Sequence, residues 1–351
     1  LGAIFKETGR LEESLLASQK SVQLLPDDAE AHNNLGATAQ EMGKIADAEA
    51  CYRTATSLDK NHAGAHGNLG IVLYKQGKFL EAESALRSAV ALQPSLADHH
   101  YNLAIVLTEL GQRIEAEASF RETISKNPNH AEAFNNLGSL LFTADKVLEA
   151  KKHFSSAIKL KQDFADAHYN LGVALKALGD LKEARECFSV AVNLRPNFES
   201  ALIGRSELLF ENGDFEEALK DADSCTSEAS RLAGLQALLA LDRLDEIFNR
   251  LHKYSESSRQ NLRMAAFASF ISQREGKDAH HNFCPNPLNF IYRSKISNHV
   301  ATTHVFLDDL VTELLAKDVL WEPSGKSTHG GYQTQWPTLF ETAVGSLAKL
   351  K

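Results

Sequence analysis

Small and large apolar residues recur along the first part of the chain at a fixed spacing of 34 residues. An Asn-Leu-Gly tripeptide stands at 34–36, 68–70, 136–138 and 170–172, and Asn102-Leu103-Ala104 fills the gap in the series. Alanines follow at the same spacing, at Ala48, Ala82, Ala116, Ala150 and Ala184. Four residues after each alanine comes a large side chain, at Tyr52, Leu86, Phe120, Phe154 and Phe188. The pattern predicts a repeated helix–turn–helix unit, because residues three or four apart share one face of a helix.

Each unit carries its own turn signal and end signal. Glycines fall between the two expected helices, at Gly43, Gly77, Gly111, Gly179 and Gly213, where a turn requires a positive φ. Asp145 takes this place in one unit, and we expect a weaker turn there. The units end at Pro26, Pro94, Pro128 and Pro196. We expect the small residue of the tripeptide to meet the alanine, and the large residue to fill the space toward the next unit. Stability then comes from stacking.

These three series resemble the tetratricopeptide repeat (TPR), a helix–turn–helix of 34 residues. The resemblance covers residues 1–228 and implies a mostly α fold, a right-handed TPR α-solenoid or superhelix. Complete units are expected at 29–62, 63–96, 97–130, 131–164 and 165–198. A degenerate unit follows at 199–232, and a partial unit occupies 1–28. Residues 229–275 are expected to form capping helices, because their leucine-rich spacing is helical although the period of 34 is lost.

The remainder of the chain has a different character. We expect a polar linker at 276–282, followed by a partial α/β segment at 283–351. In that segment the pattern predicts a strand at 287–292, a helix at 305–315, a Gly-rich loop at 321–334 and a helix at 338–350. These elements are too few for a complete domain of their own.

The last segment resembles the start of a family of oxygenases that depend on 2-oxoglutarate and iron(II). The resemblance lies in Asn286-Pro287-Leu288-Asn289-Phe290, in Trp321, and in Gly330-Gly331-Tyr332-Gln333-Thr334. Such enzymes follow TPR units in bacterial proteins and hold iron with two histidines and a carboxylate, the first His in a His-x-Asp/Glu motif. In this chain the motif occurs only at His130-Ala131-Glu132, on a boundary between repeats. We therefore expect no catalytic residue and no metal site in this chain, which would be inactive alone. Iron(II) and 2-oxoglutarate are expected only for a longer protein.

Both ends of the chain are expected to be cuts in a longer protein. Leu1 aligns with Leu35, inside a helix of a further repeat, and Lys351 lies inside an expected helix. Residues before Leu1 and after Lys351 would complete the first unit and the oxygenase.

The candidate binding residues are the asparagines at the sixth position of each unit, which are Asn34, Asn68, Asn102, Asn136 and Asn170. In TPR solenoids this position faces the concave groove, where amides can donate to and accept from the backbone of an extended peptide. The pattern is similar to the repeats of O-linked N-acetylglucosamine transferases. Tyr74, Tyr101, Tyr169 and Phe142 are expected beside the asparagines, as side-chain pockets. Two alternatives stay open: the asparagines bridge neighbouring helices, and the aromatic residues are ordinary packing.

Charge and composition narrow the classes of partner. The chain has 46 acidic and 37 basic residues and a net charge of −9, which argues against a protein that coats nucleic acid. It has no apolar run of about 18 residues, so no membrane partner is expected. Its four cysteines form no CxxC motif and favour a reducing compartment, here the cytoplasm.

Three functions fit the sequence. The first is a bacterial protein whose solenoid binds a protein or an extended peptide and presents it to an oxygenase. The second is a pure protein–protein interaction scaffold. The third is a glycosyltransferase fragment of the O-linked N-acetylglucosamine type, against which the tail offers no Gly-rich strand-to-helix turn for a nucleotide sugar.

Overall fold

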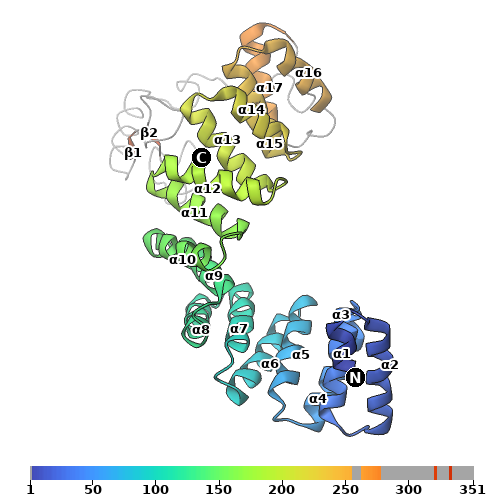
Figure 1. Ribbon diagram of the computed structural model, residues 1–351. Coiled ribbons are helices and arrows are strands. Elements are labelled where there is room, and N and C mark those ends of the chain that lie inside the picture. The colour runs from blue at the N-terminus through green and yellow to red at the C-terminus, as the bar shows by residue number, and fades with distance from the viewer. Residues whose placement is uncertain (1, 255–261, 278–319, 322–331, 334–351) are drawn as a thin grey trace, which may run out of the picture. The chain divides into compact units, whose positions relative to one another are not determined.

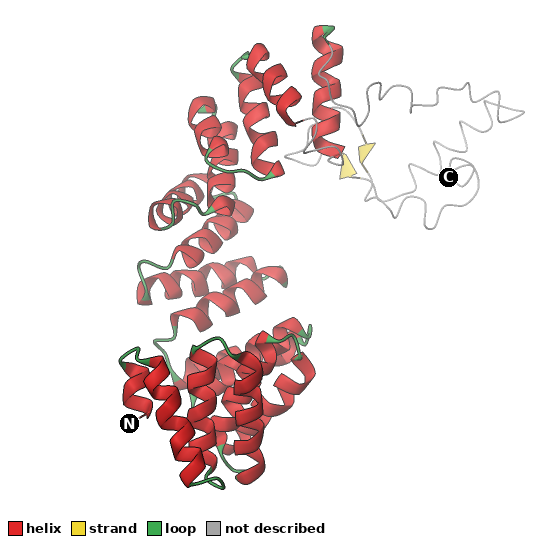
Figure 2. Cartoon of the chain, turned by 90° about the vertical axis from the view of Figure 1, so that its right-hand side faces the viewer, coloured by secondary structure: helices red, strands yellow, loops and turns green. Residues whose placement is uncertain are grey.

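The computed structural model describes residues 2–254, 262–277, 320–321 and 332–333. The chain divides into two units, Leu1–Met264 and Ala265–Lys351, each of which is described by itself. The helices of the first unit follow one another in chain order, joined by short loops (Figures 1 and 2). They are α1 Gly2–Glu7, α2 Leu11–Leu24, α3 Ala29–Glu41, α4 Ile45–Leu58, α5 Ala63–Lys75, α6 Phe79–Leu92, α7 Ala97–Glu109, α8 Arg113–Lys126, α9 Ala131–Thr143, α10 Val147–Leu160, α11 Ala165–Leu178, α12 Leu181–Leu194, α13 Glu199–Asn212, α14 Phe215–Asp223, α15 Glu228–Ala240 and α16 Leu244–Tyr254.

Helices pack in successive pairs, and each pair packs against the next. The first helix of each pair, here called the A helix, begins at the first residue of an expected unit, as α3 does at Ala29 and α5 at Ala63. The second, or B helix, follows a short turn. This arrangement is an α-solenoid, and its helices start where the period of 34 residues predicts.

The turns inside the units share one backbone conformation. Gly43 and Gly77 have φ of 74° and 75°, in the left-handed region that glycine enters without steric cost. Asp145 occupies the same region with a φ of 61°. Aspartate tolerates this conformation better than most residues, so the turn keeps its form although it lacks glycine.

Packing inside a unit differs from the expectation of small against small. A Cβ atom added at Gly36 would lie 2.8 Å from the ring of Tyr52, and one at Gly138 would lie 2.7 Å from the ring of Phe154. The glycine therefore makes room for the large residue of its own unit. The large residue also reaches the next unit in one case, because a Cβ at Gly204 would lie 3.0 Å from the ring of Phe188.

One buried core runs through successive units. The five alanines of the period are fully buried, and a continuous cluster of buried side chains extends from Ala39 to Ala174. No unit encloses a core of its own, so each depends on its neighbours.

Four histidines at the fourth position of the A helices clip the loops between units. Their Nε2 atoms lie 2.8–3.0 Å from the carbonyl oxygen of the residue six positions earlier. The pairs are His32 with Pro26, His66 with Lys60, His100 with Pro94 and His168 with Gln162. These contacts satisfy loop carbonyls that no helix reaches.

The B helices carry a ladder of ion pairs. Arg53 pairs with Glu49 of its own helix at 2.9 Å and with Glu81 of the next unit at 2.5 Å. Arg87 and Arg121 repeat this arrangement one and two units later. The charged groups of this surface are thus largely engaged with one another.

Beyond α16 the structure describes α17, Leu262–Glu275, and two short strands. Strand β1, Leu320–Trp321, pairs antiparallel with β2, Tyr332–Gln333, so that Trp321 lies opposite Tyr332. Both strands fall in or beside the stretch for which a loop was expected. The strand expected at 287–292 and the helices expected at 305–315 and 338–350 lie outside the described residues.

Candidate functional site

The asparagine series lies along α3, α5, α7, α9 and α11, one residue on each A helix. All five side chains are half-buried, so their amide groups reach the surface of the stack. We call the surface that carries them the A-helix face. It is the candidate site, because polar atoms recur there at the period of the fold.

Three of these amides join neighbouring repeats. Asn68 donates from Nδ2 to Oδ1 of Asn33 at 2.9 Å, and Asn170 donates to Asn135 at 2.9 Å. In each case the acceptor is the fifth residue of the preceding unit, 35 positions earlier. Asn136 follows the same rule with the hydroxyl of Tyr101, at 3.1 Å. The series therefore links A helices, which was one of the two interpretations of the sequence.

These bonds leave much of each amide free. A side-chain amide has two N–H donors and an oxygen with two lone pairs, so one bridge uses a small share of its capacity. Asn34 bonds Glu30 of its own helix at 2.9 Å. Bridging and binding are thus compatible at one residue.

Asn102 is the exception in the series. In the part of the chain that the structure describes, its amide has no hydrogen-bond partner. The reason is Gly67, the fifth residue of the preceding unit, which has no side chain to accept the bond. The ring of His99 occupies that space instead, because a Cβ added at Gly67 would lie 2.8 Å from its Nε2.

Tyr101 sets the spacing of two A helices. Its ring lies 4.4 Å from that of His130 and 6.1 Å from that of Phe120, measured between centroids. Helices α7 and α9 approach each other less closely than α5 and α7, where the fifth residue is Gly67. A large ring between two helices holds them apart, so this junction is the more open one. Tyr169, at the same position, packs on Phe188 and Phe198 at 5.8 and 5.1 Å.

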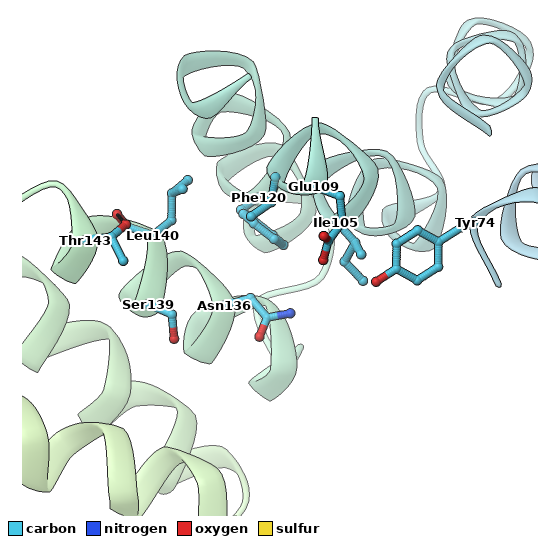
Figure 3. A pocket seen from close by; sticks show the side chains of 9 residues that line it. Tyr74, Ile105, Glu109, Phe120, Asn136, Ser139, Leu140 and Thr143 are labelled. Atoms are coloured by element: carbon cyan, nitrogen blue, oxygen red, sulfur yellow. Dashed lines mark hydrogen bonds between the residues drawn. The ribbon is translucent and has the colours of Figure 1, made fainter. Parts of the chain in front are cut away.

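A pocket of about 400 Å³ lies at this junction. Figure 3 shows the side chains of α7 and Tyr74 on one side, and those of α9 on the other. The lining residues are Tyr74 from α5, Ile105, Thr108 and Glu109 from α7, Phe120 from α8, and Asn136, Ser139, Leu140 and Thr143 from α9. The pocket thus includes two candidate residues, Tyr74 and Asn136, whereas Tyr101 lies behind it as packing.

Burial and acidic neighbours keep the tyrosines of this face neutral. Burial, followed by the Glu109 carboxylate, raises the pKa of Tyr74. Burial, followed by Glu132, raises the pKa of Tyr101, and the bond from Asn136 opposes that shift. Both hydroxyls therefore keep their protons at neutral pH and remain able to donate a hydrogen bond.

The His130-Ala131-Glu132 sequence has a structural position. Nδ1 of His130 accepts a hydrogen bond from the backbone N–H of Ala133 at 3.2 Å and so caps the start of α9. Glu132 pairs with Lys161 of the following loop at 3.2 Å. Within the described ranges, no three His, Cys, Asp or Glu side chains gather as a metal site requires. None of the described helices has both the length and the apolar character needed to cross a lipid bilayer.

The arrangement of paired helices defines a class of protein, the α-helical solenoid. Family models then identify its repeats. The model described as tetratricopeptide repeat matches residues 27–95, 101–150 and 165–198, and the model described as TPR repeat matches residues 146–179. The chain therefore contains tetratricopeptide repeats.

Solved structures agree with this fold. The Cut9-Hcn1 hetero-tetramer of APC/C is similar at 18% identity over 68% of this chain, with a TM-score of 0.57. This chain spans 48% of the length of that one. The structure titled for Pseudomonas aeruginosa pilF is similar at 22% identity over 62% of this chain and 98% of its own, with a TM-score of 0.53. A tetratricopeptide repeat protein from Parabacteroides merdae is similar at 19% identity over 69% of this chain and 98% of its own, with a TM-score of 0.50. No curated protein matches the chain.

Proposed function

We propose that this chain is a protein-interaction scaffold that binds an extended segment of a partner protein along its A-helix face. The observation that carries the proposal is the asparagine series, half-buried on five successive A helices and with amide atoms to spare. An extended backbone offers N–H and C=O groups at regular intervals, which repeated amides can bind.

The energetics favour recognition by several weak contacts. One amide–backbone hydrogen bond contributes about 0.5–1.5 kcal/mol net, so affinity requires several together. Bonds to backbone groups carry little sequence information, and the face would accept many sequences. On the opposite side, the B helices hold their charges in the ladder that Arg53, Arg87 and Arg121 form.

A random library of displayed 12-residue peptides, selected on the full chain, tests the proposal. Changing Asn68, Asn102 and Asn136 together to Ala is expected to weaken binding of the selected peptides by at least about tenfold, because three such bonds are lost. Circular dichroism should remain helical. The matched control changes three exposed asparagines outside the series, Asn61, Asn129 and Asn193, and should leave affinity unchanged. Equal affinity of the two triple variants would contradict the proposal.

A second candidate function rests on the resemblance of residues 283–351 to the start of an oxygenase. In it, the A-helix face would present the bound segment to an iron(II) and 2-oxoglutarate site for hydroxylation. The sequence of this chain does not fit such a site by itself, since the only His-x-acid motif has the structural position described above. A reading frame that continues past Lys351 with a His-x-Asp/Glu, then a His and an Arg, would support this function. A stop codon just after Lys351 would leave the scaffold alone. Succinate release by this chain alone would contradict the expectation that it lacks the catalytic residues.

The partner is a protein, and the location in a bacterial cytoplasm stays a prediction from composition and from the oxygenase resemblance. The third function, a glycosyltransferase fragment, rests on the asparagine series alone and adds no observation of its own.

A further inference from the structure

The pocket between α7 and α9 has apolar walls and one charged group. Phe120 and Leu140 are almost fully buried, and Ile105 is half-buried between them and the surface. Glu109 is exposed, and its carboxylate lies beside Ile105 on the side of the pocket that Tyr74 completes (Figure 3). A side chain that fills this space would meet apolar surface first and a carboxylate at one end.

Carboxylates elsewhere on the A helices have cationic partners. The pairs are Glu30 with His62 at 2.9 Å, Glu132 with Lys161 at 3.2 Å, Asp166 with Arg195 at 2.6 Å and Glu207 with Lys176 at 2.6 Å. By contrast, Glu109 makes no ion pair with any lysine, arginine or histidine that the structure describes. Even Lys75, at the equivalent place on α5, makes none with it.

We propose that this pocket binds the side chain of a lysine or arginine in an extended peptide, with the cation on Glu109 and the methylene stem against Ile105, Phe120 and Leu140. The inference rests on the proposed function, since it adds a specific side chain to a peptide held by its backbone. Long basic side chains bury their stems and keep the charged group at the surface, which matches this order of groups. The rings of Tyr74 and Phe120 add a face that attracts a cation.

The backbone of the same peptide has amides within reach. Asn102 lies two helical turns before Glu109 on one face of α7, and Asn136 lines the pocket itself. Asn102 has no hydrogen-bond partner among the described residues, so binding it costs no existing bond. The net charge of −9 also draws basic peptides to the chain before contact.

Other side chains fit the pocket less well. A wholly apolar side chain would remove Glu109 from water without supplying a partner, which is unfavourable. An acidic side chain would be repelled by it. The pocket therefore discriminates by charge, although the walls alone would accept any long apolar group.

The test uses the full chain and fluorescein-labelled peptides selected from the random 12-residue library described above. We expect a lysine or arginine at a fixed place in the selected peptides. Replacing that residue by norleucine, which keeps the stem and removes the charge, should weaken binding about tenfold, as expected for a charge-assisted bond. Glu109→Gln should weaken binding of the lysine peptide by a similar factor and leave the norleucine peptide unaffected. Glu41→Gln, at the same repeat position on α3, is the matched control and should change neither.

Each result decides the inference. Glu109→Lys should reverse the preference, so that a peptide with glutamate at that place binds better than the lysine peptide. Selected peptides without a basic residue, or an equal effect of Glu109→Gln on the lysine and norleucine peptides, would overturn the inference and leave the proposed function standing. Failure of the library to yield any peptide that binds wild type would overturn both.

Discussion

The side-chain amide of Asn136 donates a hydrogen bond to the hydroxyl of Tyr101, which belongs to the preceding repeat and lies 3.1 Å away. This bond crosses the junction at which α7 and α9 are farther apart and where the pocket lies. A residue of the candidate binding surface is therefore also a joint between repeats. The variants below separate the two roles.

Tyr101→Phe removes the acceptor and keeps the ring. We expect the free energy of unfolding to fall by about 0.5–1.5 kcal/mol, because one neutral hydrogen bond is lost, as urea denaturation would measure. Tyr169→Phe is the control, since the sixth residue of the next unit is Gly204 and offers no amide to its hydroxyl. An equal loss in the two variants would show that the bond to Asn136 contributes nothing.

Asn102→Ala should separate binding from stability. Its amide has no partner among the described residues, so the midpoint of urea unfolding should change little. Asn68→Ala breaks the bridge to Asn33 and should cost about 0.5–1.5 kcal/mol of stability. Both variants should weaken peptide binding. If Asn102→Ala destabilises the chain as much as Asn68→Ala, the account of the gap at Gly67 is wrong.

Gly138→Val tests the close contact inside a unit. A Cβ at this position would lie 2.7 Å from the ring of Phe154, so the variant should lose about 1–3 kcal/mol through overpacking. Gly64→Val places the same side chain where an added Cβ meets only the ring of His62, at 3.5 Å. A melting temperature that falls equally in both would assign the cost to helix propensity and not to the contact.

Stability should fall in acid through Glu49. Its hydrogen bond with Lys78, helped by Arg53, lowers its pKa from 4.5 to about 2. Because the folded chain holds this carboxylate ionised, the stabilisation is present above pH 4.5 and is lost as the pH falls toward 2. Lys78→Met should flatten this part of the profile of unfolding free energy against pH. Lys44→Met, one repeat earlier, should not, because Lys44 makes no ion pair that the structure describes. Identical profiles for Lys78→Met and wild type would contradict the assignment.

The repeat boundaries could be predicted because the same residue types recur at each helix crossing and turn. What each small residue faces could not, since spacing shows that Gly138 is small but not that Phe154 meets it. The acceptors of the asparagine bridges were missed for another reason. The fifth position is occupied by Asn33, Gly67 and Tyr101 in successive units, so it shows no period. Comparing the sixth residue of each unit with the fifth of the unit before would have found them.

The pocket was beyond the sequence for a geometric reason. It depends on how far a single ring, that of Tyr101, holds α7 from α9, which no repeat pattern encodes. Tyr74 was predicted beside the asparagines and lines this pocket, whereas Glu109 gave no signal, because its repeat position holds Glu41, Lys75 and Thr143 in other units.

The central claim is that amides of the A-helix face bind the backbone of an extended peptide. The most direct measurement is a titration of the full chain, labelled with 15N at asparagine side chains, with a selected 12-residue peptide and followed by nuclear magnetic resonance. The account predicts that the side-chain amide signals of Asn68, Asn102 and Asn136 shift together as the peptide binds, while those of Asn61, Asn129 and Asn193 stay in place. Saturable binding that leaves the first three signals unmoved would contradict it.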